Sequence, residues 1–421
     1  MARAKTTRRQ PVRRPKTQPG RGSPPRVGPL TGRLAQVPAL DVDGLISDPS
    51  VRIVVCCGSG GVGKTTTSAA LALQAAEAGR KVVVLTIDPA RRLAQSMGIE
   101  ALDNTPRPVV GVGKDIGQGV GSLDAMMLDM KRTFDEVVVA HSTPEKADQI
   151  LANPFYQAVS SSFAGTQEYM AMEKLGQLHQ EVRANGGGGG PRWDLIVVDT
   201  PPSRSALDFL DAPKRLGSFL DGRFIRLISA PAKAGGRAGL RVFNVGIGLV
   251  SSTLSRVLGG EMLRDVQTFV GALDTMFGGF RQRADQTYAL LAQRSTAFLV
   301  VAAPERDALR EASYFIARLE TERMPLTGLV LNRVQQVQAP GLGAARARAA
   351  AEDRTDDGDH LSAGLLALHA DIAGAADRQR KLARRFSVGH PSTPVVEVPA
   401  LAEDVHDVDG LRRVGEALAA G

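Results

Sequence analysis

The chain has 421 residues, 43% of them hydrophobic and 23% charged, which is typical of a folded protein with a large core. Its formal net charge is +8, but residues 1–40 hold ten Lys and Arg and no Asp or Glu, so the excess lies in one segment. No apolar run reaches the roughly 18 residues that a membrane-spanning helix needs, and we expect no integral membrane segment.

The segment 1–45 is basic and rich in Pro and Gly, which predicts a disordered tail. Attraction to anionic lipid or nucleic acid is one role for it. A solvated extension or an upstream start codon is favoured over that role, and nucleic acid is not an expected partner. The tail lacks the apolar centre of a secretion signal, and the chain has only two cysteines, so we expect a cytoplasmic protein.

The apolar run Ile53–Cys57 predicts a strand, and the Ala- and Leu-rich segment Thr66–Glu77 predicts a helix. The sequence Gly-Ser-Gly-Gly-Val-Gly-Lys-Thr-Thr joins them and fits the phosphate-loop pattern G-x-x-x-x-G-K-[ST]. In such a loop, backbone N–H groups and a helix N-terminus surround a polyphosphate. Lys64 is expected to reach the terminal phosphates and the Thr65 hydroxyl to bind Mg²⁺. The predicted nucleoside triphosphate site consists of Gly58, Ser59, Gly60, Gly61, Val62, Gly63, Lys64, Thr65 and Thr66.

Two later strands of the predicted sheet lead into aspartates. The strand Lys81–Asp88 ends at Asp88, which is expected to position or deprotonate the attacking water and to contribute to the Mg²⁺ site. The strand Trp193–Thr200 carries Asp199 near its end, expected to hold the Mg²⁺ shell directly or through water. Ligand sites of parallel sheets form at these carboxyl ends. The alternative role for both aspartates is a helix N-cap, and the site role is favoured.

Two long stretches, Leu123–Arg183 and Leu207–Arg294, are expected to be helical and to form a subdomain. The second has apolar residues at helical spacing over 240–277. These residues form either a packed core, which is favoured, or a groove for a helix of a client protein. Adaptable lining for such a groove would come from Met126, Met127 and Met130.

The last strands are expected at Ala297–Ala303, Thr327–Asn332 and Pro394–Val398, all continuous apolar runs typical of a buried parallel sheet. The segment Gln338–Asp359 between them is interpreted as a variable connection. The amide of Asn332 offers a donor and an acceptor to an adenine edge. Pro399 is expected to cover the other side of the ring.

Four motifs occur in a set order: Gly-Gly-Val-Gly-Lys-Thr-Thr, Thr-Ile-Asp-Pro-Ala, Val-Asp-Thr-Pro-Pro and Leu-Asn-Arg. In order and spacing they resemble the ArsA-type ATPases, a family that includes the arsenite-pump ATPase and the ATPase that delivers tail-anchored membrane proteins. The resemblance covers most of residues 50–415. More narrowly, the chain is similar to actinobacterial anion-transporting-ATPase-like proteins, which are encoded as pairs of unlike paralogues.

With the alternation of strands and helices, the resemblance implies an α/β fold: a doubly wound, mostly parallel P-loop NTPase sheet with an inserted α-helical subdomain. The expected domains are the tail, 1–45, and an ATPase domain, 46–421, with helical insertions at about 120–185 and 207–294. By the resemblance, the protein is a dimer that uses ATP and Mg²⁺, with two nucleotides facing each other. The roles it assigns are phosphate and Mg²⁺ binding to Lys64 and Thr65, water positioning to Asp88, Mg²⁺ support to Asp199 and adenine recognition to Asn332.

The chain departs from the family pattern at several positions. Ser59 stands where the family loop has a lysine that reaches into the partner's site, and Arg92, beside Arg91, stands where the switch has an asparagine. The arsenite-binding cysteines and the zinc-binding Cys-x-x-Cys pair have no counterpart. Cys56 and Cys57 are neighbours in a strand and point to opposite faces, so they predict neither a metal site nor an arsenite site.

The function expected from these observations is a cytoplasmic Mg-dependent ATPase that couples ATP hydrolysis in a dimer to handling or targeting of a client protein. Two alternatives remain. One is a nucleotide-binding regulatory subunit of a heterodimer, with weak hydrolysis alone, which Ser59 favours. The other is a partition- or positioning-type ATPase, which only the basic tail favours. The partner is a second copy or, preferably, a paralogous ATPase.

Overall fold

A computed structural model describes residues 37–88, 92–112, 121–154, 156–157, 160, 166–183, 192–201 and 282–420. The chain divides into two compact units, Met1–Arg33 and Leu34–Gly421, and the first lies outside the described residues. The predicted apolar series over 240–277 also lies outside them. The fold below is therefore that of the second unit.

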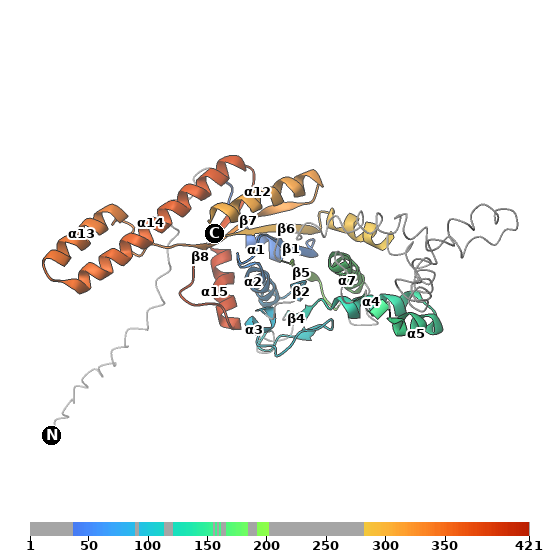
Figure 1. The fold of residues 1–421 in the computed structure, drawn as a ribbon. Helices are drawn as coiled ribbons and strands as arrows, with labels where there is room; N and C mark the ends of the chain where they lie inside the picture. The colour runs from blue at the N-terminus through green and yellow to red at the C-terminus, as the bar shows by residue number, and fades with distance from the viewer. Residues whose placement is uncertain are drawn as a thin grey trace, which may run out of the picture. The chain divides into compact units, whose positions relative to one another are not determined.

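The centre of this unit is one eight-stranded sheet with the order β3-β4-β2-β5-β1-β6-β7-β8 (Figure 1). All neighbouring strands are parallel except β3, which is antiparallel to β4. The strands are β1 Ile53–Cys57, β2 Lys81–Thr86, β3 Arg107–Pro108, β4 Ser122–Met127, β5 Leu195–Asp199, β6 Thr296–Ala302, β7 Leu326–Val334 and β8 Val395–Pro399. The α/β fold class predicted from the sequence is confirmed.

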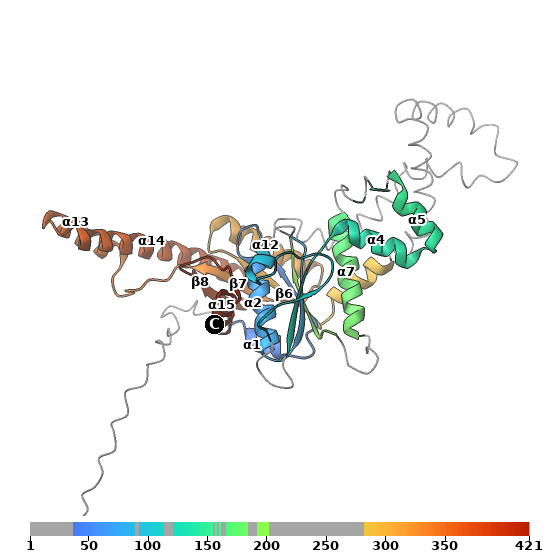
Figure 2. The ribbon, with the colours of Figure 1, turned by 90° about the horizontal axis from the view of Figure 1, so that it is seen from below.

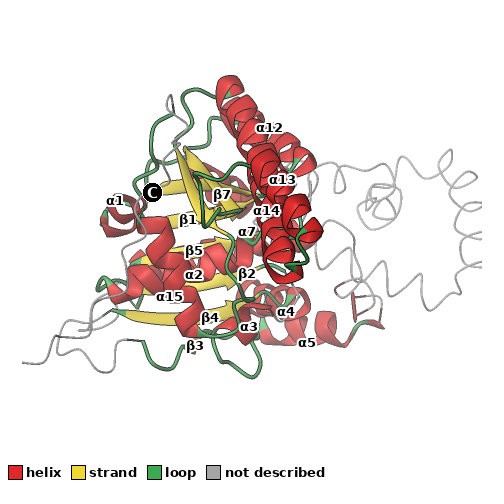
Figure 3. Ribbon diagram, turned by 90° about the vertical axis from the view of Figure 1, so that its left-hand side faces the viewer, coloured by secondary structure: helices red, strands yellow, loops and turns green. Residues whose placement is uncertain are grey.

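Helices cover both sides of this sheet (Figure 3). On one side lie α1 Val42–Ser47, α2 Lys64–Glu77, α3 Arg92–Ser96 and α15 Val408–Ala419. On the other lie α4 Met130–His141, α7 Thr166–Arg183, α12 Arg306–Thr321 and the end of α14 His360–Gly389. The other helices of the described residues are α5 Pro144–Ala152 and α13 Ala344–Asp356.

Alternation along the strands divides the core into two layers, as a pleated sheet requires. Cys57 and Val55 of β1 face α7 and α12, whereas Cys56 and Val54 face α2 and α15. Both cysteines are fully buried and free. This agrees with the expectation that adjacent strand cysteines point apart.

Three segments differ from what the sequence predicts. The helical stretch predicted from Leu123 begins instead with strand β4, and its Met126 is fully buried in the core, so Met126 does not line a groove. Helix α13 lies within the segment interpreted as a variable connection. Residues 37–45, counted with the tail, join the domain, since Leu40 and Val42 are buried and Leu40 N donates to the Val395 carbonyl at 3.2 Å.

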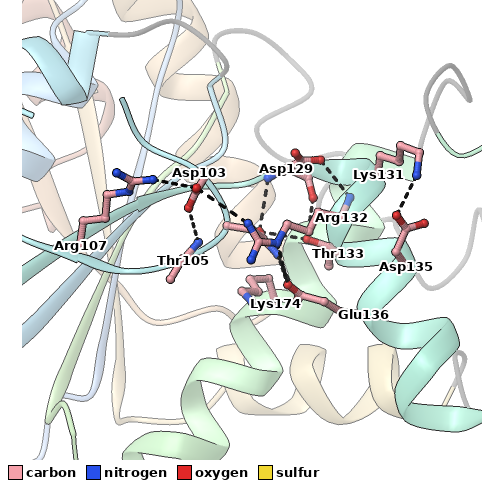
Figure 4. A network of polar contacts seen from close by, with 11 residues as sticks. Asp103, Thr105, Arg107, Asp129, Lys131, Arg132, Thr133, Asp135, Glu136 and Lys174 are labelled. Carbon is pink, nitrogen blue, oxygen red and sulfur yellow. Dashed lines mark hydrogen bonds and ion pairs between the residues drawn. The ribbon is translucent and has the colours of Figure 1, made fainter. Parts of the chain in front are cut away.

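The described start of the predicted helical subdomain is connected to the sheet by a polar network (Figure 4). The Asn104 amide nitrogen donates to both carboxylate oxygens of Glu136 in α4, at 3.0 and 3.1 Å. Lys174 of α7 donates to the same carboxylate at 3.1 Å, and the Thr133 hydroxyl donates to Asn104 Oδ1 at 3.1 Å. Because Thr133, Asn104 and Lys174 are all buried, these bonds fix α4 and α7 to the loop that follows α3.

The helices α13 and α14 form a hairpin that extends away from the sheet (Figure 2). The His369 ring nitrogen Nε2 lies 2.8 Å from the Leu342 carbonyl, and Arg348 forms an ion pair with Asp371, so the two helices are connected near the base of the hairpin. Beyond residue 376, α14 returns to the domain, where Ala383 and Phe386 join the core beside α12. None of the helices in the described part of the chain has the length and apolar character that a membrane crossing requires.

Candidate functional site

The loop after β1 has the backbone conformation that a phosphate loop needs. Gly58, Gly61 and Gly63 have φ angles of 154°, 76° and 92°, which residues with a side chain rarely adopt. A Cβ at Gly58 would lie 2.1 Å from the Val301 carbonyl oxygen, so the loop passes too close to β6 for any side chain there. The backbone geometry therefore requires glycine at positions 58, 61 and 63.

Helix α2 starts at Lys64 with no side chain capping its first turn. Its free N–H groups and the positive end of its dipole face the loop, an arrangement suited to an anion. The Lys64 ammonium is buried and donates to the Ser59 carbonyl at 2.8 Å. Burial lowers the pKa of Lys64, while Asp199 and Asp88 act to raise it. The lysine is thus a buried cation that contacts the loop and interacts electrostatically with two carboxylates.

The ends of β1, β2 and β5 bring the predicted Mg²⁺ residues together. Thr65 Oγ1 donates to Asp199 Oδ2 at 2.7 Å, and Thr86 Oγ1 donates to the same oxygen at 2.9 Å. The strand register produces this contact, since Thr86 and Asp199 are direct partners in β2 and β5. Asp199 is fully buried, and its Oδ1 is a buried oxygen without a hydrogen-bond partner among the described residues.

Burial raises the pKa of Asp199 to about 6, against the opposing effects of its bonds to Thr65 and Thr86 and of the Lys64 charge. A buried carboxylate oxygen with no partner is costly unless something binds it. A carboxylate and a hydroxyl are the oxygen donors that Mg²⁺ prefers. The residues present therefore fit Mg²⁺, with Thr65 and Asp199 as the groups that would hold it. No cluster of three or more His, Cys, Asp or Glu that could hold a metal occurs within the described ranges.

Asp88 follows β2 and lies close enough to this cluster to act electrostatically on both Lys64 and Asp199. Its backbone N–H donates to Thr86 Oγ1 at 3.2 Å. Thr86 therefore connects the Asp88 segment to Asp199. The sequence motif does not assign this role to Thr86. The role follows from its place at the end of β2, in register with Asp199 of β5.

Two side chains of strand β7 donate hydrogen bonds to the phosphate loop. The Asn332 amide nitrogen donates to the Val62 carbonyl at 2.8 Å, and Arg333 Nη1 donates to the Gly61 carbonyl at 2.8 Å. A Cβ at Gly63 would lie 2.2 Å from Asn332 Nδ2. Arg333 has a φ of 60°, a conformation uncommon for a residue with a side chain. Asn332 thus has a structural role in bracing the loop, beyond the adenine recognition predicted for it.

Pro399 lies at the end of β8, paired in register with Val334 of β7. The N–H of Ala400 donates to the Val334 carbonyl at 2.9 Å. Asn332 and Pro399 therefore lie at the carboxyl ends of neighbouring strands, and Asn332 contacts the loop. Their contact with an adenine ring stays a prediction.

Two segments next to the site, the one after β5 and the one before α3, are described only in part. The Thr200 hydroxyl donates to the Cys56 carbonyl at 2.9 Å, which fixes the start of the segment after β5. Arg92 is exposed at the start of α3, whereas Arg91, Pro202 and Ser203 lie outside the described residues. Burial raises the pKa of Cys56 and Cys57 to about 12, so neither thiol ionises near neutral pH.

Comparisons with known proteins agree with these motifs. Residues 51–348 match the profile of a family described as anion-transporting ATPase. The chain is 30% identical over 182 residues to the ATPase GET3 of Malassezia globosa, covering 43% of this chain and 48% of that protein. It is 23% identical over 294 residues to the ATPase ASNA1 homolog 2 of Paramecium tetraurelia, covering 69% and 78% of the two chains.

A further relative is the ATPase GET3 of Podospora anserina, 24% identical over 293 residues, with 69% of this chain and 75% of that protein covered. The match thus spans about half of the Malassezia protein and three quarters of the other two. All three alignments join this chain to proteins named as ATPases.

Proposed function

Because this chain belongs to the ArsA-type family of anion-transporting ATPases, we propose that it binds and hydrolyses ATP with Mg²⁺ and couples this cycle to handling or targeting of a client protein. The observation that carries the proposal is the Thr65–Asp199–Thr86 cluster beside the phosphate loop. The proposal assigns ATP and Mg²⁺ as cofactors, a dimer as the working form and the cytoplasm as the compartment.

Each residue has a role in this proposal. The backbone of the loop from Gly58 to Gly63 and the buried ammonium of Lys64 bind the phosphates, where a charged donor makes the strongest hydrogen bonds. Thr65 and Asp199 hold Mg²⁺, which when bound neutralises charge developing on the phosphates. Asp88 orients the attacking water, and Thr86 positions the Asp88 segment relative to Asp199. Asn332 and Pro399 enclose the adenine.

Mg²⁺-dependent turnover tests the proposal. Wild-type protein is expected to hydrolyse ATP in Mg²⁺ and to stop when EDTA removes the ion, and Thr65→Ala is expected to need far more Mg²⁺ for the same rate. Thr67→Ala is the matched control, since Thr67 is in the same helix but its hydroxyl donates to the Gly63 carbonyl instead of Asp199. An unchanged Mg²⁺ requirement in Thr65→Ala would contradict the assignment.

A second candidate function rests on Ser59. This residue is 8% exposed and contributes its carbonyl to Lys64, while its side chain carries no charge. A dimer of identical chains would lack the lysine that the family inserts across the interface. We therefore also propose that the chain pairs with a paralogous ATPase that supplies this lysine. In that heterodimer the chain binds ATP and turns it over slowly by itself.

A further inference from the structure

The first half of the hairpin helix α14 buries alanines and exposes three leucines. In its first half the buried side chains are Ala363, Ala370 and Ala373. Leu361, Leu365 and Leu368 are 77%, 60% and 57% exposed. Leucine is among the residues most often found inside proteins, and three exposed leucines at helical spacing on one element form an apolar surface that usually meets a partner.

These leucines continue into a stripe along α14. At about 100° per residue, the side chains of the stripe fall within a sector of about 80°. The stripe is about 21 Å long at 1.5 Å per residue, and its midpoint is Leu368. Its members are Leu361, Leu365, Leu368, Ile372 and Ala375.

The hairpin carries opposite charges at the two ends of α14. The exposed turn at its tip holds Asp356, Asp357 and Asp359. From residue 378 to its end at Gly389, α14 carries five exposed basic residues and no acidic one: Arg378, Arg380, Lys381, Arg384 and Arg385. The tip is therefore acidic and the base of α14 is basic, with the apolar stripe between them.

We propose that α14 pairs with α14 of a second copy of this chain, antiparallel, with the two-fold axis at Leu368. In this register Leu368 meets Leu368 and Leu361 meets Ala375, while Leu365 lies level with Asp371 and next to Ile372. A two-fold contact requires a surface that is complementary to itself. This stripe meets that condition because the large Leu361 at one end faces the small Ala375 of the other copy.

The charged residues of the hairpin favour the same antiparallel register. Residue 379 lies 11 residues after Leu368, and residue 357 lies 11 residues before it. Arg378 and Arg380 of one copy therefore come opposite the turn 356–358 of the other, and the reverse contact occurs at the far end. Within its own copy Arg380 forms an exposed ion pair with Asp377, and Asp357 forms one with Arg354. Such exposed pairs contribute little and exchange readily. A parallel pairing would place acid beside acid and base beside base.

Light scattering of the full chain without nucleotide, in EDTA, tests the pairing. The wild type is expected to be a dimer at micromolar concentration, and Leu365→Glu is expected to raise the dimer dissociation constant by about tenfold or more. Val139→Glu in α4 is the control, because Val139 is 57% exposed on a different helix. A monomeric wild type, or a Leu365→Glu variant that dimerises normally, overturns the proposal.

Charge reversal tests the antiparallel register. Arg378→Glu/Arg380→Glu and Asp356→Lys/Asp357→Lys are each expected to be monomeric alone, because each places like charges at both ends of the dimer. An equal mixture of the two variants is expected to dimerise, since opposite charges then meet at both ends. A mixture that stays monomeric, or variants that each dimerise like the wild type, contradicts this register.

A disulfide locates the axis. Leu368→Cys is expected to form an intermolecular disulfide with its own copy on mild oxidation, since identical residues meet only at a two-fold axis. Leu361→Cys is the control and is expected to cross-link only when Ala375→Cys is also present. The natural cysteines do not interfere because both are buried in the core. Efficient cross-linking of Leu361→Cys alone would place the axis elsewhere and overturn the proposed register.

Discussion

Asp199 shows at the scale of one residue how burial and function oppose each other. The carboxyl group is fully buried, and its oxygen Oδ1 has no partner among the described residues. Burial is the largest effect on its pKa and favours the neutral acid, whereas Mg²⁺ needs the carboxylate. The residue is thus unfavourable for stability and suited to an ion.

This conflict predicts a pH dependence. A group whose pKa rises from 3.8 to about 6 on folding stabilises the fold below pH 4 and loses that contribution as the pH rises through 6, an effect of about 3 kcal/mol. Asp199→Asn does not titrate, so it lacks this pH-dependent contribution. Its free energy of unfolding, measured in urea without Mg²⁺, should therefore rise relative to that of the wild type between pH 4.5 and 7. Parallel pH profiles for the two proteins would show that the wild-type carboxyl group is not destabilised by burial.

Lys64 is a second buried charge with a ligand role. Its ammonium donates to the Ser59 carbonyl, which is a weaker partner than a phosphate. Lys64→Ala should therefore keep the fold but lose the rise in melting temperature that ATP gives the wild type. Differential scanning fluorimetry with and without Mg-ATP measures this. An undiminished ATP shift in the variant would remove Lys64 from the site.

Asp88 should matter for hydrolysis more than for binding. A positioned base contributes typically about 10²–10⁴-fold to a rate, so Asp88→Asn is expected to bind ATP normally and turn it over that much more slowly. Nucleotide affinity and turnover are measured on the same sample, alone and with the partner. Wild-type turnover in both conditions would be incompatible with the proposed role.

At the scale of elements, β7 and the phosphate loop behave as one unit. Asn332→Ala leaves the buried Val62 carbonyl without its donor, which costs about 1–3 kcal/mol. The variant should melt earlier even without ATP, while Arg333→Ala, which removes an exposed side chain, should melt nearly normally. If Asn332 acts only on adenine, its loss will change ATP affinity and the preference for ATP over GTP, and the nucleotide-free melting temperature will stay at the wild-type value.

Patterns in the sequence predict the strands that are buried on both faces, because continuous runs of Val, Ile and Leu are typical of such strands. Strand β4, Ser-Leu-Asp-Ala-Met-Met, has no β-branched residue, so its sequence predicts a helix. The alternating Arg and Ala of helix α13 resemble a linker, because the sequence does not show that Ala347 and Ala351 form a buried face. The sequence does not predict the role of Thr86, because that role depends on which strand lies beside β2.

In the site too, local motifs can be predicted from the sequence, whereas contacts between distant segments cannot. Lys64 and Thr65 belong to a local motif, so the sequence alone places them. The contacts of Asp199 with Thr65 and Thr86 join strand β5 to helix α2 and strand β2, more than 100 residues earlier in the chain, and the pattern indicates only the shared edge of the sheet. The bracing by Asn332 spans 270 residues and has no local signal.

At the scale of the whole molecule, the two proposed dimer contacts, through α14 and across the phosphate loops, require different partners. Pairing through α14 matches one copy of this chain to another. Pairing across the phosphate loops would benefit from a lysine that this chain lacks. The two contacts use different surfaces, so one does not replace the other, and a paralogue at the loops is compatible with a second copy at α14.

The missing lysine gives the final prediction. A cation placed on the transferring phosphoryl group is worth about 10³–10⁵ in rate where an arginine finger supplies it. Ser59→Lys should therefore raise the turnover of this chain purified alone, and wild-type chain should reach comparable turnover only when mixed with a paralogue that has the lysine. Arg92 is the alternative source of charge, being exposed at the start of α3 beside Arg91. Full activity of the isolated wild type, lost in Arg91→Ala or Arg92→Ala, would assign the charge to the chain's own switch and refute the need for a partner.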